Sequence, residues 1–88
     1  MISESKAREI AGMWYAGQWA ALYKVASCQD YDKLSRQDWM EARYEAQKEA
    51  VYCIHRKEKK NSQELSALAD WIRFVAEKHG KPVEGCLV

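Results

Sequence analysis

Turn-forming residues are scarce in this chain, which has one proline and four glycines among its 88 residues. This scarcity excludes a turn-rich small β domain. Four tryptophans, five tyrosines and a hydrophobic fraction of 48% make the chain too apolar for intrinsic disorder. Helix is the secondary structure that remains, and a chain of this length forms one domain with a core of modest size.

Cysteine is also sparse, and the number of cysteines is odd. Cys28, Cys53 and Cys86 are widely spaced, so they cannot form a closed disulfide framework within one chain. The first residues contain no continuous apolar segment of the signal-peptide type. The longest apolar-rich stretch, residues 10–28, is interrupted by polar side chains and does not resemble a membrane span. We therefore expect a cytoplasmic protein with no membrane partner.

Hydrophobic periodicity and capping residues predict three helices, over residues 4–26, 36–59 and 62–79. Ser3 is a good N-cap for the first helix. Ser35 and Asp38 have the spacing of a capping box at the start of the second helix. No glycine or proline separates the second helix from the third, so one long bent helix is an alternative. Asn61 and Glu64 also have capping-box spacing, and Gly80 fits the end of the third helix.

These helices predict an all-α fold, a small three-helix bundle, with a dimer of helical hairpins as the alternative. Residues 1–80 form the single predicted domain, and residues 81–88 form a C-terminal tail that is either docked or frayed. The predicted core contains Trp14, Leu22, Trp39, Leu68 and Ile72. In the second helix, a small-residue stripe faces the core and has bulky flanking residues: Met40, Tyr44, Val51 and Ile54.

The first predicted helix is apolar on several sides. Tyr15, Trp19 and Tyr23 recur every four residues and form an aromatic row beside a second apolar row on the same helix. Two such rows cannot both face one neighbouring helix, so we expect a homodimer or an obligate partner surface. Such a row is also typical of a helix side that packs into the hydrophobic core. Tyrosine and tryptophan are nevertheless enriched at interfaces, and the row is therefore the predicted partner-binding site.

The second predicted helix contributes an acidic row to this binding face. Glu41, Glu45 and Glu49 are four residues apart and share one side of the helix. A solvated helix face is the simpler interpretation of such a row. The predicted protein-binding face combines the aromatic row with the acidic one.

Net charge is only +1, but the charges are unevenly distributed. Four bases lie within five residues at the end of the second predicted helix: Arg56, Lys57, Lys59 and Lys60. This cluster could contact phosphates, so the alternative function is a nucleic-acid-associated module. The simpler interpretation is that the bases compensate the dipole at the helix C-terminus.

No catalytic or metal-binding motif is evident. Cys53 and His55 point to different sides of a helix, and the other cysteines and His79 lack the spacing of zinc ligands. There is no phosphate loop or nucleophile elbow. We therefore expect no enzyme activity, no metal and no cofactor.

One segment resembles a known group of proteins. Residues 7–27, AREIAGMWYAGQWAALYKVAS, resemble part of small uncharacterised proteins of bacterial prophages and mobile elements, in which the segment reads W-x-G-G-Q-W-S-x-L-Y. Gly17, Gln18 and Trp19 match that pattern, whereas Ala16 and Ala20 depart from it. The resemblance implies a setting but no functional residues. Small helical proteins from that setting resemble in kind inhibitors of host machinery, anti-CRISPR proteins among them.

The sequence therefore predicts a non-enzymatic protein-binding module. The more specific prediction is an inhibitor or regulator of host machinery. A nucleic-acid module using the basic cluster is one alternative. A structural subunit that binds only its own copies is another.

Overall fold

The computed structural model describes residues 1–14 and 19–83 of the chain. Its helices are α1 (Glu4–Met13), α2 (Ala20–Ser27), α3 (Arg36–His55) and α4 (Lys59–Lys78), and a short 3-10 helix, η1 (Tyr31–Lys33), precedes α3. The described ranges contain no strand. The predicted all-α class is therefore confirmed.

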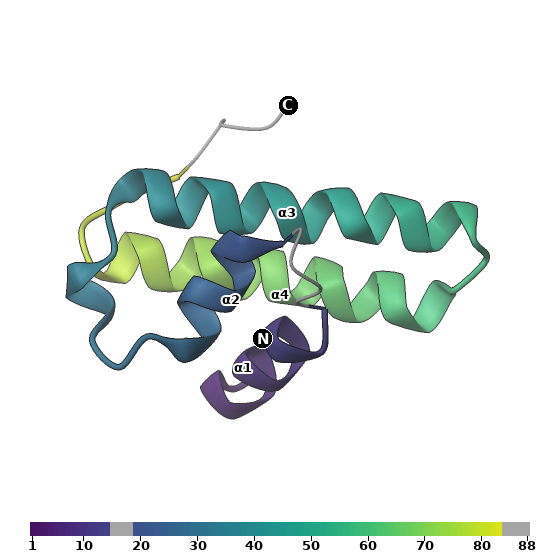
Figure 1. Ribbon diagram of the computed structural model, residues 1–88, viewed down its shortest axis with the longest axis horizontal. Coiled ribbons are helices and arrows are strands. Elements are labelled where there is room, and N and C mark those ends of the chain that lie inside the picture. The colour runs from purple at the N-terminus through teal and green to yellow at the C-terminus, as the bar shows by residue number, and fades with distance from the viewer. Residues whose placement is uncertain (15–18, 84–88) are drawn as a thin grey trace.

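The longest helices, α3 and α4, form an antiparallel hairpin, and α1 and α2 cover one side of it (Figure 1). The contact between α3 and α4 is the most extensive in the molecule. α2 packs on α3, α1 packs on α4, and the two short helices also pack on each other. The turn between α3 and α4 lies at the right-hand end of the view in Figure 1, and we call this end the hairpin tip.

The start of α3 is set by local side-chain chemistry. The Asp38 amide donates to Ser35 Oγ at 3.1 Å, and the Ser35 amide donates to Asp38 Oδ2 at 2.9 Å. These two bonds satisfy amides that a helix start leaves without partners inside the helix. Leu34 and Trp39, on either side of the cap, are both buried. The predicted capping box is confirmed.

The single first helix predicted over residues 4–26 is wrong. α1 ends at Met13, and α2 begins at Ala20 after Trp19, whose φ of −113° and ψ of 57° are not helical. Because the chain changes direction, the apolar sides of this segment contact α3, α4 and each other. One straight helix could not bury so many sides. The crowding that suggested a partner for the first helix is largely relieved within the chain.

The boundaries predicted at residues 59 and 62 are also wrong, and so is the alternative of one continuous helix. α3 ends at His55, and α4 begins at Lys59 with Glu58 as its N-cap. Lys57 has a φ of 63°, and the amides of Lys57 and Glu58 donate to the carbonyls of Ile54 and Cys53 at 2.9 and 2.8 Å. This pattern is a Schellman motif, which satisfies the last carbonyls of α3 and turns the chain. The predicted Asn61–Glu64 cap is not used.

α4 ends in the same way at the glycine that the sequence indicated. Gly80 has a φ of 75°, and the Lys81 amide donates to the Ala76 carbonyl at 2.8 Å. The start of the tail is docked, because Val83 is fully buried and Arg36 Nε donates to the Pro82 carbonyl at 2.7 Å. The remaining tail residues, 84–88, lie outside the described residues.

Tyr31 in η1 contacts side chains of three helices, α1, α3 and α4. Its ring makes edge contacts with the rings of Trp39, Trp71 and His79 at centroid distances of 5.5, 6.0 and 5.9 Å. The Arg8 guanidinium of α1 lies 5.0 Å from the centre of the same ring. The short connection before α3 therefore packs against the edge of the hydrophobic core. Of the predicted core residues, Leu22, Trp39, Leu68 and Ile72 are fully buried, and Trp14 is half-buried.

Candidate protein-binding surface on α3

The structure does not assemble the predicted aromatic row on one surface. Trp19 is 8% exposed and belongs to the core, whereas Tyr23 is about half exposed. Tyr15 lies outside the described residues. Trp19 therefore supports the fold and offers little area to a partner.

The acidic row is also divided among different environments. Glu45 is half-buried and accepts from the amides of Leu22 and Ala21 at 2.9 and 3.3 Å, which caps the start of α2. Burial raises the pKa of the Glu45 carboxyl, although these two bonds oppose the shift. Glu49 is buried and pairs with Arg56 at 2.9 Å. Only Glu41 is exposed as expected for a solvated row.

A different surface emerges on the side of α3 that faces away from the core. Four large side chains there are 41–61% exposed, and we call them the outer face of α3: Tyr44, Val51, Tyr52 and Ile54. The sequence placed three of these at the edges of the buried stripe, and that placement is wrong. The stripe that contacts the core is narrower and consists mainly of small residues, so the flanking side chains remain in solvent.

Lys48 lies between Tyr44 and Tyr52 of this outer face. Its Nζ is 5.5 Å from the centre of the Tyr44 ring, close enough for a cation–π contact. The side chains of Tyr44 and Tyr52, one turn away on each side, raise the pKa of Lys48. The outer face therefore presents apolar area together with a fixed positive charge.

At the hairpin tip, the residues of the predicted basic cluster also lie in different environments. Arg56 binds Glu49 and also Glu58, at 2.9 and 3.0 Å, and these bonds raise the pKa of the guanidinium. Arg56 therefore holds the turn together. Within the described part of the chain, Lys57, Lys59 and Lys60 are exposed and take part in no ion pair.

An open groove lies beside these lysines. Its volume is about 500 Å³, and it is lined by Ile54, Lys57, Lys59, Ser62 and Gln63. Ile54 belongs to both the groove and the outer face, so the two surfaces are continuous. An apolar floor with two lysines favours a ligand that is partly apolar and carries negative charge.

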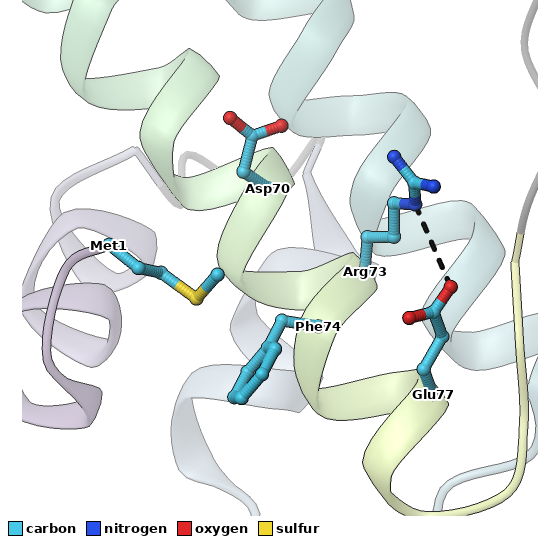
Figure 2. Close-up of a pocket in the computed structure, with 5 residues that line it drawn as sticks. All are labelled: Met1, Asp70, Arg73, Phe74 and Glu77. Carbon is cyan, nitrogen blue, oxygen red and sulfur yellow. Dashed lines mark ion pairs between the residues drawn. The ribbon is translucent and has the colours of Figure 1, made fainter.

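A second hollow lies against α4, on the side shown in Figure 2. It has a volume of about 390 Å³ and is lined by Met1, Asp70, Arg73, Phe74 and Glu77. The Met1 side chain points between Asp70 and Phe74, and Arg73 pairs with Glu77 at 3.8 Å (Figure 2). The charges at this hollow are of both signs, so it has no preference for a charged ligand comparable to that of the tip.

The described residues provide no group of three or more His, Cys, Asp or Glu side chains that could hold a metal ion. Cys53 is buried, and burial raises the pKa of its thiol, which disfavours the nucleophilic thiolate. None of the helices described is both long and apolar enough to cross a membrane.

Comparisons with known proteins find no match to a family model, to a curated protein or to a solved structure. The resemblance of residues 7–27 to prophage and mobile-element proteins therefore stays a prediction.

The outer face of α3 had a signal in the sequence that periodicity alone does not interpret. Tyr44, Val51 and Ile54 have the spacing of a helix stripe, but so does the neighbouring alanine stripe. The small-residue stripe faces inward, as the sequence predicts, but the spacing does not determine how far burial extends beyond that stripe. The alanines permit close helix packing, and the bulky stripe is left outside.

Proposed function

We propose that this protein is a non-enzymatic protein-binding module that binds its partner through the outer face of α3. The observation that carries the proposal is the exposure of four large side chains on eleven consecutive residues of one helix. Clustered exposed apolar side chains mark interaction surfaces, whereas isolated ones are ordinary. Tyrosine is also among the residues enriched at interface hot spots.

The finer role implied by the resemblance, inhibition or regulation of host machinery, belongs to the same proposal. Such a role requires an exposed face on this chain but no catalytic group. The outer face of α3 meets that requirement.

Site-specific photo-crosslinking tests the proposal. A benzophenone side chain at position 51 samples the outer face, and the same group at Ser66, an exposed position on α4, is the matched control. In lysate of the cells that make the protein, we expect protease-sensitive adducts from position 51 and few from position 66. Equal labelling from both positions, or none from position 51, would contradict the proposal.

A second candidate function is association with nucleic acid at the hairpin tip. It is favoured by the exposed, unpaired state of Lys57, Lys59 and Lys60 in the described structure. In this case crosslinks from position 51 are sensitive to nuclease, and affinity for oligonucleotides falls steeply with salt. Binding that is absent at low salt eliminates this candidate.

A further inference from the structure

The outer face of α3 extends into a regular two-heptad pattern. Positions 40, 44, 47, 51 and 54 alternate in steps of four and three, as the a and d positions of a coiled coil do. They hold Met40, Tyr44, Gln47, Val51 and Ile54. Tyr44, Val51 and Ile54 are exposed, whereas Met40 and Gln47 are half-buried and Met40 also packs against the core. We call these five residues the outer seam. A stripe this narrow matches the width of one helix laid along α3.

One end of the seam lies beside positively charged side chains. It ends at Ile54, which also lines the tip groove with Lys57 and Lys59. Lys57 is held at a φ of 63°, a conformation in which glycine is usual and a side chain costs free energy. Lys48 lies along the edge of the seam, one turn from Tyr44. Cations therefore border the seam at its middle and at its end.

A second copy of this chain fits the seam poorly. An antiparallel pair would bring Lys48 close to its symmetry mate and would face the tip lysines with Glu41 and with Asp38, which already pairs with Lys24. The seam is also short, and its few half-exposed side chains offer less than the roughly 800 Å² per partner of a standard stable interface. A partner that also covers the tip groove gains both area and charge complementarity.

We propose that the outer seam and the tip groove together bind an acidic amphipathic helix of another protein. This inference rests on the proposed function and specifies the partner. The apolar side chains of that helix lie on Tyr44, Val51 and Ile54, and its carboxylates approach Lys48, Lys57 and Lys59. The recognition mode is a helix laid on a helix face, with charge selecting the partner and its direction.

Two stapled helical peptides of about 18 residues provide the probe. Both have leucine at the a and d positions; one has glutamate at the flanking e and g positions and the other has lysine there. By fluorescence anisotropy, the acidic peptide should bind at least roughly tenfold more tightly than the basic one, and added salt should weaken its binding. Equal affinity for both peptides, or no binding of the acidic peptide, overturns the inference.

Matched variants locate the binding. V51S/I54S should abolish binding of the acidic peptide, whereas F74S, which removes an apolar side chain of similar exposure on α4, should not. K57Q/K59Q should reduce the preference for the acidic peptide, whereas K33Q/K78Q should leave it unchanged. All four sets of substitutions are at exposed positions, and circular dichroism verifies the helix content of each variant.

The outcomes separate this inference from the proposed function. Crosslinking of proteins from position 51 without binding of the acidic peptide overturns only the acidic-helix partner. Loss of crosslinking overturns both. If sedimentation shows a dimer that V51S/I54S converts to monomer, the occupant is a second copy and the inference is wrong.

Discussion

At the scale of single residues, Lys57 is the clearest case of a side chain that costs stability. Its left-handed conformation is unfavourable for residues with a Cβ atom, by about 1 kcal/mol. K57G should therefore raise the free energy of unfolding by about 1 kcal/mol in urea denaturation. K60G, in the first turn of α4, is the control and should lower stability. A K57G protein less stable than the natural one would contradict this account of the turn.

Glu45 is a residue whose role depends on a contact far away in sequence. Trp19 gives α2 no side-chain cap, and the Glu45 carboxylate of α3 supplies one through the amides of Ala21 and Leu22. E45A should lower the free energy of unfolding by about 1 kcal/mol, as loss of an N-cap does. E41A removes an exposed carboxylate from the same helix and should change it by less than about 0.5 kcal/mol. Equal effects of the two substitutions would show that Glu45 does not act as a cap.

At the scale of elements, the hairpin tip depends on Arg56. Glu49 is buried, and its carboxylate accepts from Arg56 Nη2 at 2.9 Å. R56A leaves that carboxylate buried without its cation, so the free energy of unfolding should fall. K59A removes an exposed lysine nearby and should have little effect on stability. Chemical denaturation of both variants tests this, and equal stabilities would contradict the structural role of Arg56.

The helices differ in how far the sequence determines them. The starts of α1 and α3 and the end of α4 were predictable, because Ser3, Ser35 and Gly80 act within one turn of the chain. The division between α1 and α2 was not, because it depends on which apolar sides find neighbours. The same holds for the site: the small-residue stripe of α3 is correctly predicted to face the core, but the exposure of Tyr44 and Val51 on its flanks depends on how the helices pack.

The residues predicted for binding illustrate this limit. Residue type and spacing predict Trp19 and Glu49 as binding residues, but Trp19 is buried in the core and Glu49 is buried in an ion pair with Arg56. Charge alone predicts Lys57 and Lys59 as contacts of the alternative nucleic-acid function, and both are exposed. Local composition therefore indicated the tip lysines, whereas the apolar part of the candidate surface required the packed structure.

At the scale of the whole molecule, two sets of carboxyl groups act on stability in opposite directions as pH changes. The Ser35 amide, and then Lys24, lower the pKa of Asp38 below its ordinary value of 3.8. The unfolded chain then binds protons more readily than the folded one, so stability falls as pH decreases below about 3.8. Asp32, which accepts from His79, and Glu58, which accepts from Arg56, have lowered pKa values and act in the same direction.

Glu45 acts in the opposite direction because burial raises its pKa above 4.5. Between 4.5 and that raised value, the folded protein holds a proton that the unfolded chain releases, so stability falls as pH rises. E45Q cannot titrate and should lose this decline while retaining the loss below pH 3.8. Urea denaturation of both proteins from about pH 3 to about pH 7 measures the difference. If the free energies of unfolding of the natural protein and E45Q differ by a constant amount from pH 4.5 upward, the Glu45 carboxyl titrates in the folded protein as it does in the unfolded chain.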